Sequence, residues 1–104
     1  MNLCDFEAID WDDAEDEDGN LAHCLRHGDD EVVVYQVLSE NPVEIQIRLT
    51  TADLCVVGPD YGRSFWTILF NWSFKRGDWL RPVTGWKAEP QEINEWQRVT
   101  GRRL

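Results

Sequence analysis

Residues 64–74 read SFWTILFNWSF and carry the strongest apolar pattern in the chain. Every second residue is large and apolar, which is typical of a β-strand with one face in a core. That face would carry Trp66, Ile68, Phe70, Trp72 and Phe74. Phe65 and Leu69 partly cover the other face. Because both faces carry apolar side chains, we predict that this strand is central in its sheet.

Three further segments near this strand have strand patterns. Residues 43–50 (VEIQIRLT) alternate apolar with polar, and residues 54–58 (LCVVG) form a short apolar run. The turn GPDYGR leads into the central strand, and the turn KRGD leads out of it to residues 79–86 (WLRPVTGW). We therefore predict an antiparallel four-stranded sheet. A short lead-in, Phe6 to Trp11, is a candidate edge strand.

Helical patterns lie at both ends of the chain. Residues 20–27 (NLAHCLRH) end at Gly28 and carry an apolar stripe of Leu21, Cys24 and Leu25. The next segment begins at Asp29 and Asp30, either of which could cap a helix, and stops at Pro42. Its valines also suit a strand, but Val34, Val37 and Leu38 fit the helical period and favour a helix, with Val33 also facing inward. The last segment starts at Pro90, with Ile93, Trp96 and Val99 on one face. The prediction is one α+β domain over residues 1–104, with two N-terminal helices and one C-terminal helix packed on the sheet.

The charge of the chain is unevenly distributed. The net charge of −10 divides into −13 for residues 1–44 and +3 for residues 45–104. The first half would repel nucleic-acid phosphates, so a nucleic-acid surface would have to come from the second half. No apolar run is long enough to span a bilayer, and the first residues lack the features of a signal peptide. With three scattered cysteines and no CxxC, we expect a reduced, cytoplasmic protein.

An ordered set of short motifs resembles the BrnT toxin family. The stretches that carry this resemblance are DWDDAEDEDGNLAHCLRHG, VVGPDYGRSFWTILF and RPVTGWKA. The matching residues are Trp11-Asp12, Asn20, Arg26-His27-Gly28, Gly62-Arg63, and Arg81, Val83, Thr84 and Ala88. The chain departs from the family at Gly85, where the family has Ala, and at Trp86, where it has a second Arg. An acidic insertion around DAEDED also lengthens the entry to the first helix.

The resemblance implies a RelE-like fold and a metal-independent endoribonuclease, the toxin of a type II toxin–antitoxin module, with an antitoxin as partner and no cofactor. In such a reaction a 2′-hydroxyl attacks the adjacent phosphate with help from a base, a cation and an acid. His27 is the titrating candidate, and Arg63 and Arg81 are the catalytic cations. The RNA-binding candidates are Lys75, Arg76, Thr84 and Trp86.

Each of these residues also has a purely structural interpretation. Arg81 could pair with the acidic residues 12–19, Arg63 could pair with Asp60, and Lys75-Arg76 could be a solvated hairpin tip. The acidic run does not fit a calcium loop, because Ala14 and Leu25 occupy two ligand positions. We expect no metal at His23 and His27, since a third ligand is not evident. The alternative function is an inactive acidic interaction module that docks a basic protein or imitates the charge of a nucleic acid.

Overall fold

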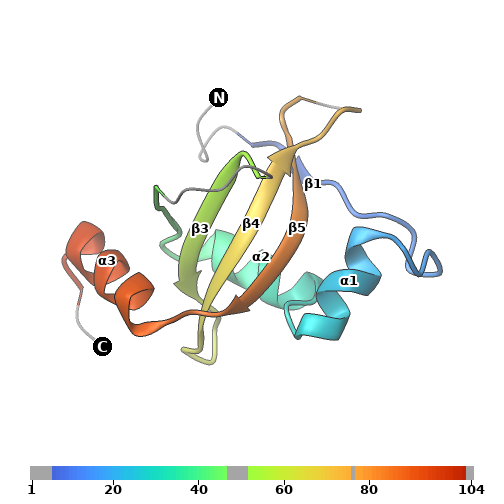
Figure 1. Cartoon of the computed structure of the whole chain (residues 1–104). Coiled ribbons are helices and arrows are strands. Elements are labelled where there is room, and N and C mark those ends of the chain that lie inside the picture. Colours follow the sequence, from blue (N-terminus) through green and yellow to red (C-terminus); the bar gives the residue numbers. More distant parts are fainter. Residues whose placement is uncertain (1–5, 47–51, 76, 103–104) are drawn as a thin grey trace.

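A single mixed sheet runs through the computed structural model, which describes residues 6–46, 52–75 and 77–102 (Figure 1). Its strands are β1 (Ala8–Ile9), β2 (Val43–Glu44), β3 (Leu54–Pro59), β4 (Phe65–Trp72) and β5 (Trp79–Lys87). The helices are α1 (Asn20–His27), α2 (Glu31–Ser39) and α3 (Pro90–Thr100). The strand order is β1-β5-β4-β3-β2, so β4 is central, as its two apolar faces predict. The α+β class is confirmed.

The predicted four-stranded antiparallel sheet is wrong in one respect. β2, β3, β4 and β5 pair antiparallel, but β1 adds a fifth strand that pairs parallel with β5. Its register places Ala8 beside Trp79 and Ile9 beside Leu80. The segment Phe6 to Trp11 is thus an edge strand, of only two residues. Its partner lies some seventy residues further along the chain, so no local pattern reveals the direction of pairing.

Two predicted strands are shorter in the structure. β2 covers Val43–Glu44 of the predicted 43–50, and residues 47–50 lie outside the described residues. β4 ends at Trp72, so Phe74 is fully exposed instead of lining the strand face. The chain turns there because the Ser73 N–H donates to the Trp79 carbonyl at 2.9 Å, and the Ser73 hydroxyl donates to Asp10 at 2.6 Å.

Each face of the central strand packs against a different helix. Trp66, Ile68 and Phe70 point toward α2, where Val34 and Val37 are fully buried. On the other face Phe65 meets Trp96 of α3. Figure 1 shows α2 crossing behind the sheet, α1 beside β5, and α3 beside β3. The period-two pattern of β4 is therefore explained by two separate apolar clusters, one on each face.

The helix boundaries follow the local signals. α1 ends at Gly28, whose φ of 90° is a left-handed conformation that glycine adopts without strain. The Asp30 carboxylate accepts a hydrogen bond from the Val33 N–H and caps α2, so the helix, not the strand alternative, is confirmed. Glu89 and Glu92 form a capping box at the start of α3. Two predicted inward positions are wrong, because Leu25 and Val99 are each 52% exposed. No helix among the described residues has the length and apolar character to cross a membrane.

Asp12 connects the N-terminal segment to α1 and to β5. Its carboxylate accepts two hydrogen bonds from Arg81, at 2.8 and 2.6 Å, and a third from the Asn20 backbone N–H at 2.9 Å. The third bond satisfies a free N–H in the first turn of α1. No neighbouring aspartate is the capping residue, since that position is Gly19, where a Cβ would come within 2.7 Å of the Asp12 Cβ. One carboxylate thus holds three separate segments in place.

We expect Asp12→Asn to lower the free energy of unfolding by about 1–3 kcal/mol, because it removes a charge-assisted pair. Arg81 holds the pKa of Asp12 at about 2, below the ordinary 3.8. The stability that the ionised Asp12 contributes to the fold is therefore fully present above pH 3.8 and is lost as the pH falls toward 2. Urea unfolding at several pH values measures this loss. Glu17→Gln is the matched control, since that exposed side chain makes no hydrogen bond to a described residue. Equal stabilities of the two variants would contradict the assigned role of Asp12.

Candidate functional site

An open cleft of about 440 Å³ lies between α1 and the strands β4 and β5, and we name it the α1–β5 cleft. Its lining consists of Asp18, Gly19, Asn20, His23, Arg26, Asn71, Arg81, Pro82 and Val83. The wall on the β5 side is held close to α1 by Asn20, whose buried amide donates to the carbonyls of Asp10 and Pro82 at 2.9 and 3.0 Å. The cleft is thus lined by polar and basic side chains, and the hydrogen bonds of Asn20 hold its two walls in place.

Two imidazoles meet beside this cleft, where His23 belongs to the lining and His27 contacts His23 from outside it. The rings of His23 and His27 have centroids 4.6 Å apart and are tilted by 51°. The Nε2 atom of His23 lies 3.1 Å from the Thr84 hydroxyl of β5. His23 is half-buried, whereas His27 is exposed in the last turn of α1. Imidazole is the usual proton donor and acceptor near neutral pH, so this arrangement can transfer protons at the edge of the cleft.

The sequence makes His27 and Thr84 candidates, whereas it assigns His23 no catalytic role. The structure shows that His23 is the one in contact with Thr84, and that it lies between Thr84 and His27 in the arrangement of side chains. The spacing of the two histidines, four residues apart on a helix, was the available signal. That spacing places both rings on one face, but it cannot indicate that β5 lies beside them.

Arg81 lines the cleft, but its charge is already compensated. Its two terminal nitrogens bind Asp12, and Nη1 also lies 3.7 Å from the Asp10 carboxylate. The hydrogen bonds that the guanidinium donates to Asp12 raise the pKa of Arg81 above its ordinary value. Of the two interpretations of Arg81, pairing with the acidic segment is the one seen in the structure. Arg26 is the more available cation of the cleft, since its Nη1 makes only a 3.3 Å hydrogen bond to the Glu17 carbonyl and no ion pair with a described residue.

The remaining predicted residues are dispersed. Arg63 belongs to the loop between β3 and β4, lines a different pocket, and forms no ion pair with Asp60 or any other described residue. Trp86 is half-buried, and its indole N–H donates to Glu92 of α3 at 3.2 Å. Lys75 is exposed in the loop between β4 and β5, and Arg76 lies outside the described residues. The structure thus gathers His27, Thr84 and Arg81 around α1 and β5 and separates Arg63 from them.

A buried carboxylate, which sequence analysis treated only as a cap candidate, lies behind α1. Asp29 is fully buried, and neither carboxylate oxygen has a hydrogen-bond partner by geometry among the described residues. Burial raises the pKa of Asp29. Its carboxylate occupies the space that a Cβ at Gly85 would need. This close approach explains why glycine stands at position 85, where the resembled family has alanine.

The described residues contain no group of three or more His, Cys, Asp or Glu side chains arranged to hold a metal ion. The two described cysteines are buried and unpaired. Burial raises the pKa of both the Cys24 and the Cys55 thiols to about 12. Each thiol therefore stays protonated at neutral pH and is a poor nucleophile.

The close contact between Asp29 and Gly85 leads us to predict that a larger residue at position 85 destabilises the fold. Gly85→Ala should lower the free energy of unfolding by about 1–3 kcal/mol, because the added methyl overlaps the Asp29 carboxylate. In the presence of Asp29→Ala the same substitution should cost less, since the added methyl then meets only the Thr67 carbonyl oxygen, at 3.1 Å. Thermal unfolding of the two single variants and the double variant gives the coupling. Strictly additive effects would show that the two residues do not compete for space.

Comparisons with known proteins add no relative. No family model matches the chain, and no curated protein or solved structure matches it. The resemblance to BrnT toxins rests on the quoted motifs alone, and a function has to be argued from the site.

Proposed function

We propose that the protein is a BrnT-like toxin that cleaves RNA without a metal, and that the reaction takes place at the α1–β5 cleft. The observation that carries the proposal is the contact of His23 with His27 and Thr84 at the edge of an open cleft that also contains Arg26. This combination brings proton-transfer groups and a cation to one surface. The ordered motifs of the sequence supply the independent support.

The two imidazoles divide the proton transfers. One imidazole accepts the proton of the 2′-hydroxyl as its oxygen bonds to phosphorus, and the other, protonated, donates to the 5′-oxygen as its bond to phosphorus breaks. The products are a 2′,3′-cyclic phosphate and a 5′-hydroxyl. Arg26 stabilises the negative charge that develops on the phosphate oxygens. Arg81, held by Asp12, positions the β5 wall of the cleft, and the Thr84 hydroxyl fixes the His23 ring.

The acidic loop, residues 13–18, favours a basic protein partner in addition to RNA. Its five carboxylates, Asp13, Glu15, Asp16, Glu17 and Asp18, are all exposed, and none forms an ion pair with a described residue. Asp18 also lines the α1–β5 cleft. A basic antitoxin docked on this loop would cover the cleft and exclude RNA. The same surface would serve a module without catalysis, which is the second candidate function.

Cleavage of a short RNA by the purified protein tests the ribonuclease proposal. We expect His23→Ala and His27→Ala each to lower the rate by about 10²-fold or more, because general acid–base catalysis contributes that much. Arg26→Gln should also lower it, whereas Arg98→Gln, on the exposed face of α3, is the matched control.

A substrate with a 2′-deoxy residue should resist cleavage, and EDTA should have no effect. Induction of the chain in a bacterial host should arrest growth. Absence of both cleavage and growth arrest with the unmodified chain would reject the ribonuclease and leave the interaction module. Full cleavage by the His23→Ala/His27→Ala double variant would reject the site.

The docking surface makes a separate prediction. The protein encoded by the neighbouring gene, if it is a small basic antitoxin, should bind with an affinity that falls as salt is added. Replacing Glu15 and Glu17 by Gln should weaken this binding mainly through a slower association rate. Glu95→Gln, which removes an acid on α3, is the control. Surface plasmon resonance measures these rates. Equal association rates for the unmodified chain, the Glu15/Glu17 variant and the Glu95→Gln control would show that the partner does not bind at the acidic loop.

A further inference from the structure

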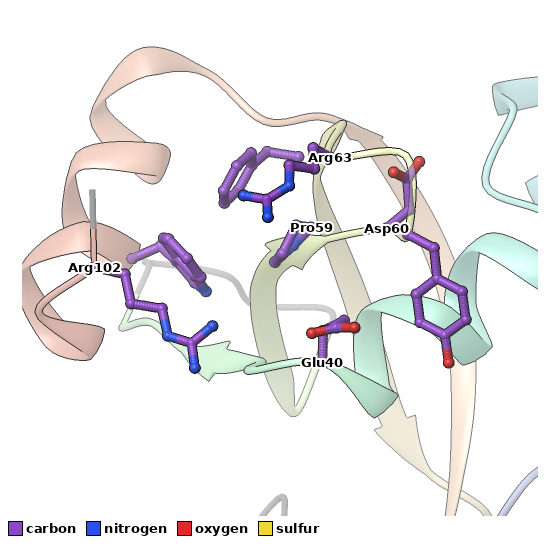
Figure 2. Close-up of a pocket in the computed structure, with 8 residues that line it drawn as sticks. Glu40, Pro59, Asp60, Arg63 and Arg102 are labelled. Atoms are coloured by element: carbon purple, nitrogen blue, oxygen red, sulfur yellow. The ribbon is translucent and has the colours of Figure 1, made fainter. Parts of the chain in front are cut away.

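A second pocket, of about 170 Å³, lies between the β3–β4 loop, the end of α2 and α3 (Figure 2). It shares no lining residue with the α1–β5 cleft. Its apolar part is formed by Pro59, Phe65 and Trp96. The rings of Phe65 and Trp96 meet edge to face with centroids 4.8 Å apart, and both residues are buried. The pocket therefore has a rigid aromatic wall that is held by the core and not by flexible surface groups.

Two guanidinium groups line the same pocket. Figure 2 shows Arg63 reaching from the β3–β4 loop toward α3, and Arg102 reaching from the segment after α3 toward Glu40. Neither forms an ion pair with a described residue. When the Asn41 amide is oriented with its oxygen toward Arg102, the guanidinium donates hydrogen bonds to that oxygen at 3.0 and 3.2 Å. These bonds orient the Arg102 guanidinium but leave its charge uncompensated.

The two carboxylates of the pocket differ in availability. Asp60 points away from the arginines in Figure 2, because its oxygens accept hydrogen bonds from the Ser64 N–H at 2.9 Å and from the Trp66 indole N–H at 3.0 Å. Glu40, at the end of α2, is exposed and forms no ion pair with a described residue. Two uncompensated cations thus face one acid that remains free.

The backbone of Arg63 supplies a second, independent observation. Its φ is 66°, and it is the one described residue other than glycine with a positive φ. The loop fixes this conformation, since the Arg63 N–H donates to the Asp60 carbonyl at 3.1 Å and the Asp60 N–H donates to the Ser64 carbonyl at 2.8 Å. Glycine would adopt it without strain. A strained residue that carries a charged side chain without a partner indicates a function for that side chain.

We propose that this pocket binds a small molecule that carries a carboxylate or phosphate monoester on a flat apolar group. The anion binds between Arg63 and Arg102, because guanidinium groups donate paired hydrogen bonds to planar carboxylates and to phosphates. The apolar group packs against Phe65, Trp96 and Pro59. Glu40 lowers the affinity for anions, since its charge has the same sign as the ligand. This site is independent of the proposed ribonuclease activity.

Binding of two probes, benzoate and phenyl phosphate, to the full chain tests the proposal. Trp96 offers the readout, since its indole N–H donates to the Asn41 carbonyl at 2.7 Å and gives an NMR signal that Trp96→Phe assigns. We expect at least one probe to shift this signal in a saturable way, and benzyl alcohol, which is uncharged, to leave it unmoved. The probe that binds identifies the anion.

The matched variants separate binding from folding. Arg63→Gly should weaken binding about tenfold or more while leaving the unfolding midpoint equal or higher, because it removes the guanidinium and relaxes the backbone. Arg102→Gln should weaken binding similarly, and Glu40→Gln should strengthen it. Arg98→Gln, on the same helix end but paired with Glu95, should change nothing. Failure of both probes to bind, equal binding of benzyl alcohol, or unchanged binding in both Arg63→Gly and Arg102→Gln would overturn the proposal.

Discussion

The carboxylate of Asp12 is the constraint on which much of the structure depends. It accepts hydrogen bonds from the fork of Arg81 and from the first turn of α1, and Asn20 continues the connection to the carbonyls of Asp10 and Pro82. A short parallel strand such as β1 has few backbone hydrogen bonds of its own. These side-chain contacts therefore supply the rigidity that keeps α1 against β5 and gives the α1–β5 cleft its shape.

The same network has a consequence for function. Arg81 lies in the cleft, but both terminal nitrogens of its guanidinium donate hydrogen bonds to Asp12. The group is therefore poorly placed to bind phosphate as well. In the proposed ribonuclease reaction, Arg26 would therefore stabilise the developing charge, and His23 and His27 would transfer the protons. An acidic loop beside the cleft would slow the approach of RNA, yet it suits a basic inhibitor that must find the same site. The two candidate functions would thus use neighbouring surfaces.

Half-buried Asp12 and buried Asp29 make the stability of the fold depend on pH in opposite directions. Asp12 has a lowered pKa and stabilises the fold when ionised. Burial raises the pKa of Asp29 in the folded state. The stability linked to its protonation is therefore fully present below pH 3.8 and is lost as the pH rises through the folded-state pKa. Asp29 therefore costs stability at neutral pH, and glycine at position 85 is what makes room for it. No hydrogen bond among the described residues explains why an acid occupies this position.

Sequence patterns alone predict the elements whose signals are local. The alternation in β4, the end of α1 at Gly28 and the cap of α2 at Asp30 involve residues within a few positions of each other, so periodicity and capping rules identify them. The predicted inward positions of Phe74 and Val99 are wrong, because Phe74 lies beyond the end of β4 and Val99 lies on an exposed side of α3. Tertiary structure alone decided the parallel pairing of β1, the contact of His23 with Thr84 and the separation of Arg63 from the cleft. The His23–Thr84 and Asp12–Arg81 contacts join residues 61 and 69 positions apart, and their geometry depends on how the sheet closes around them. No rule based on spacing along the chain contains that information.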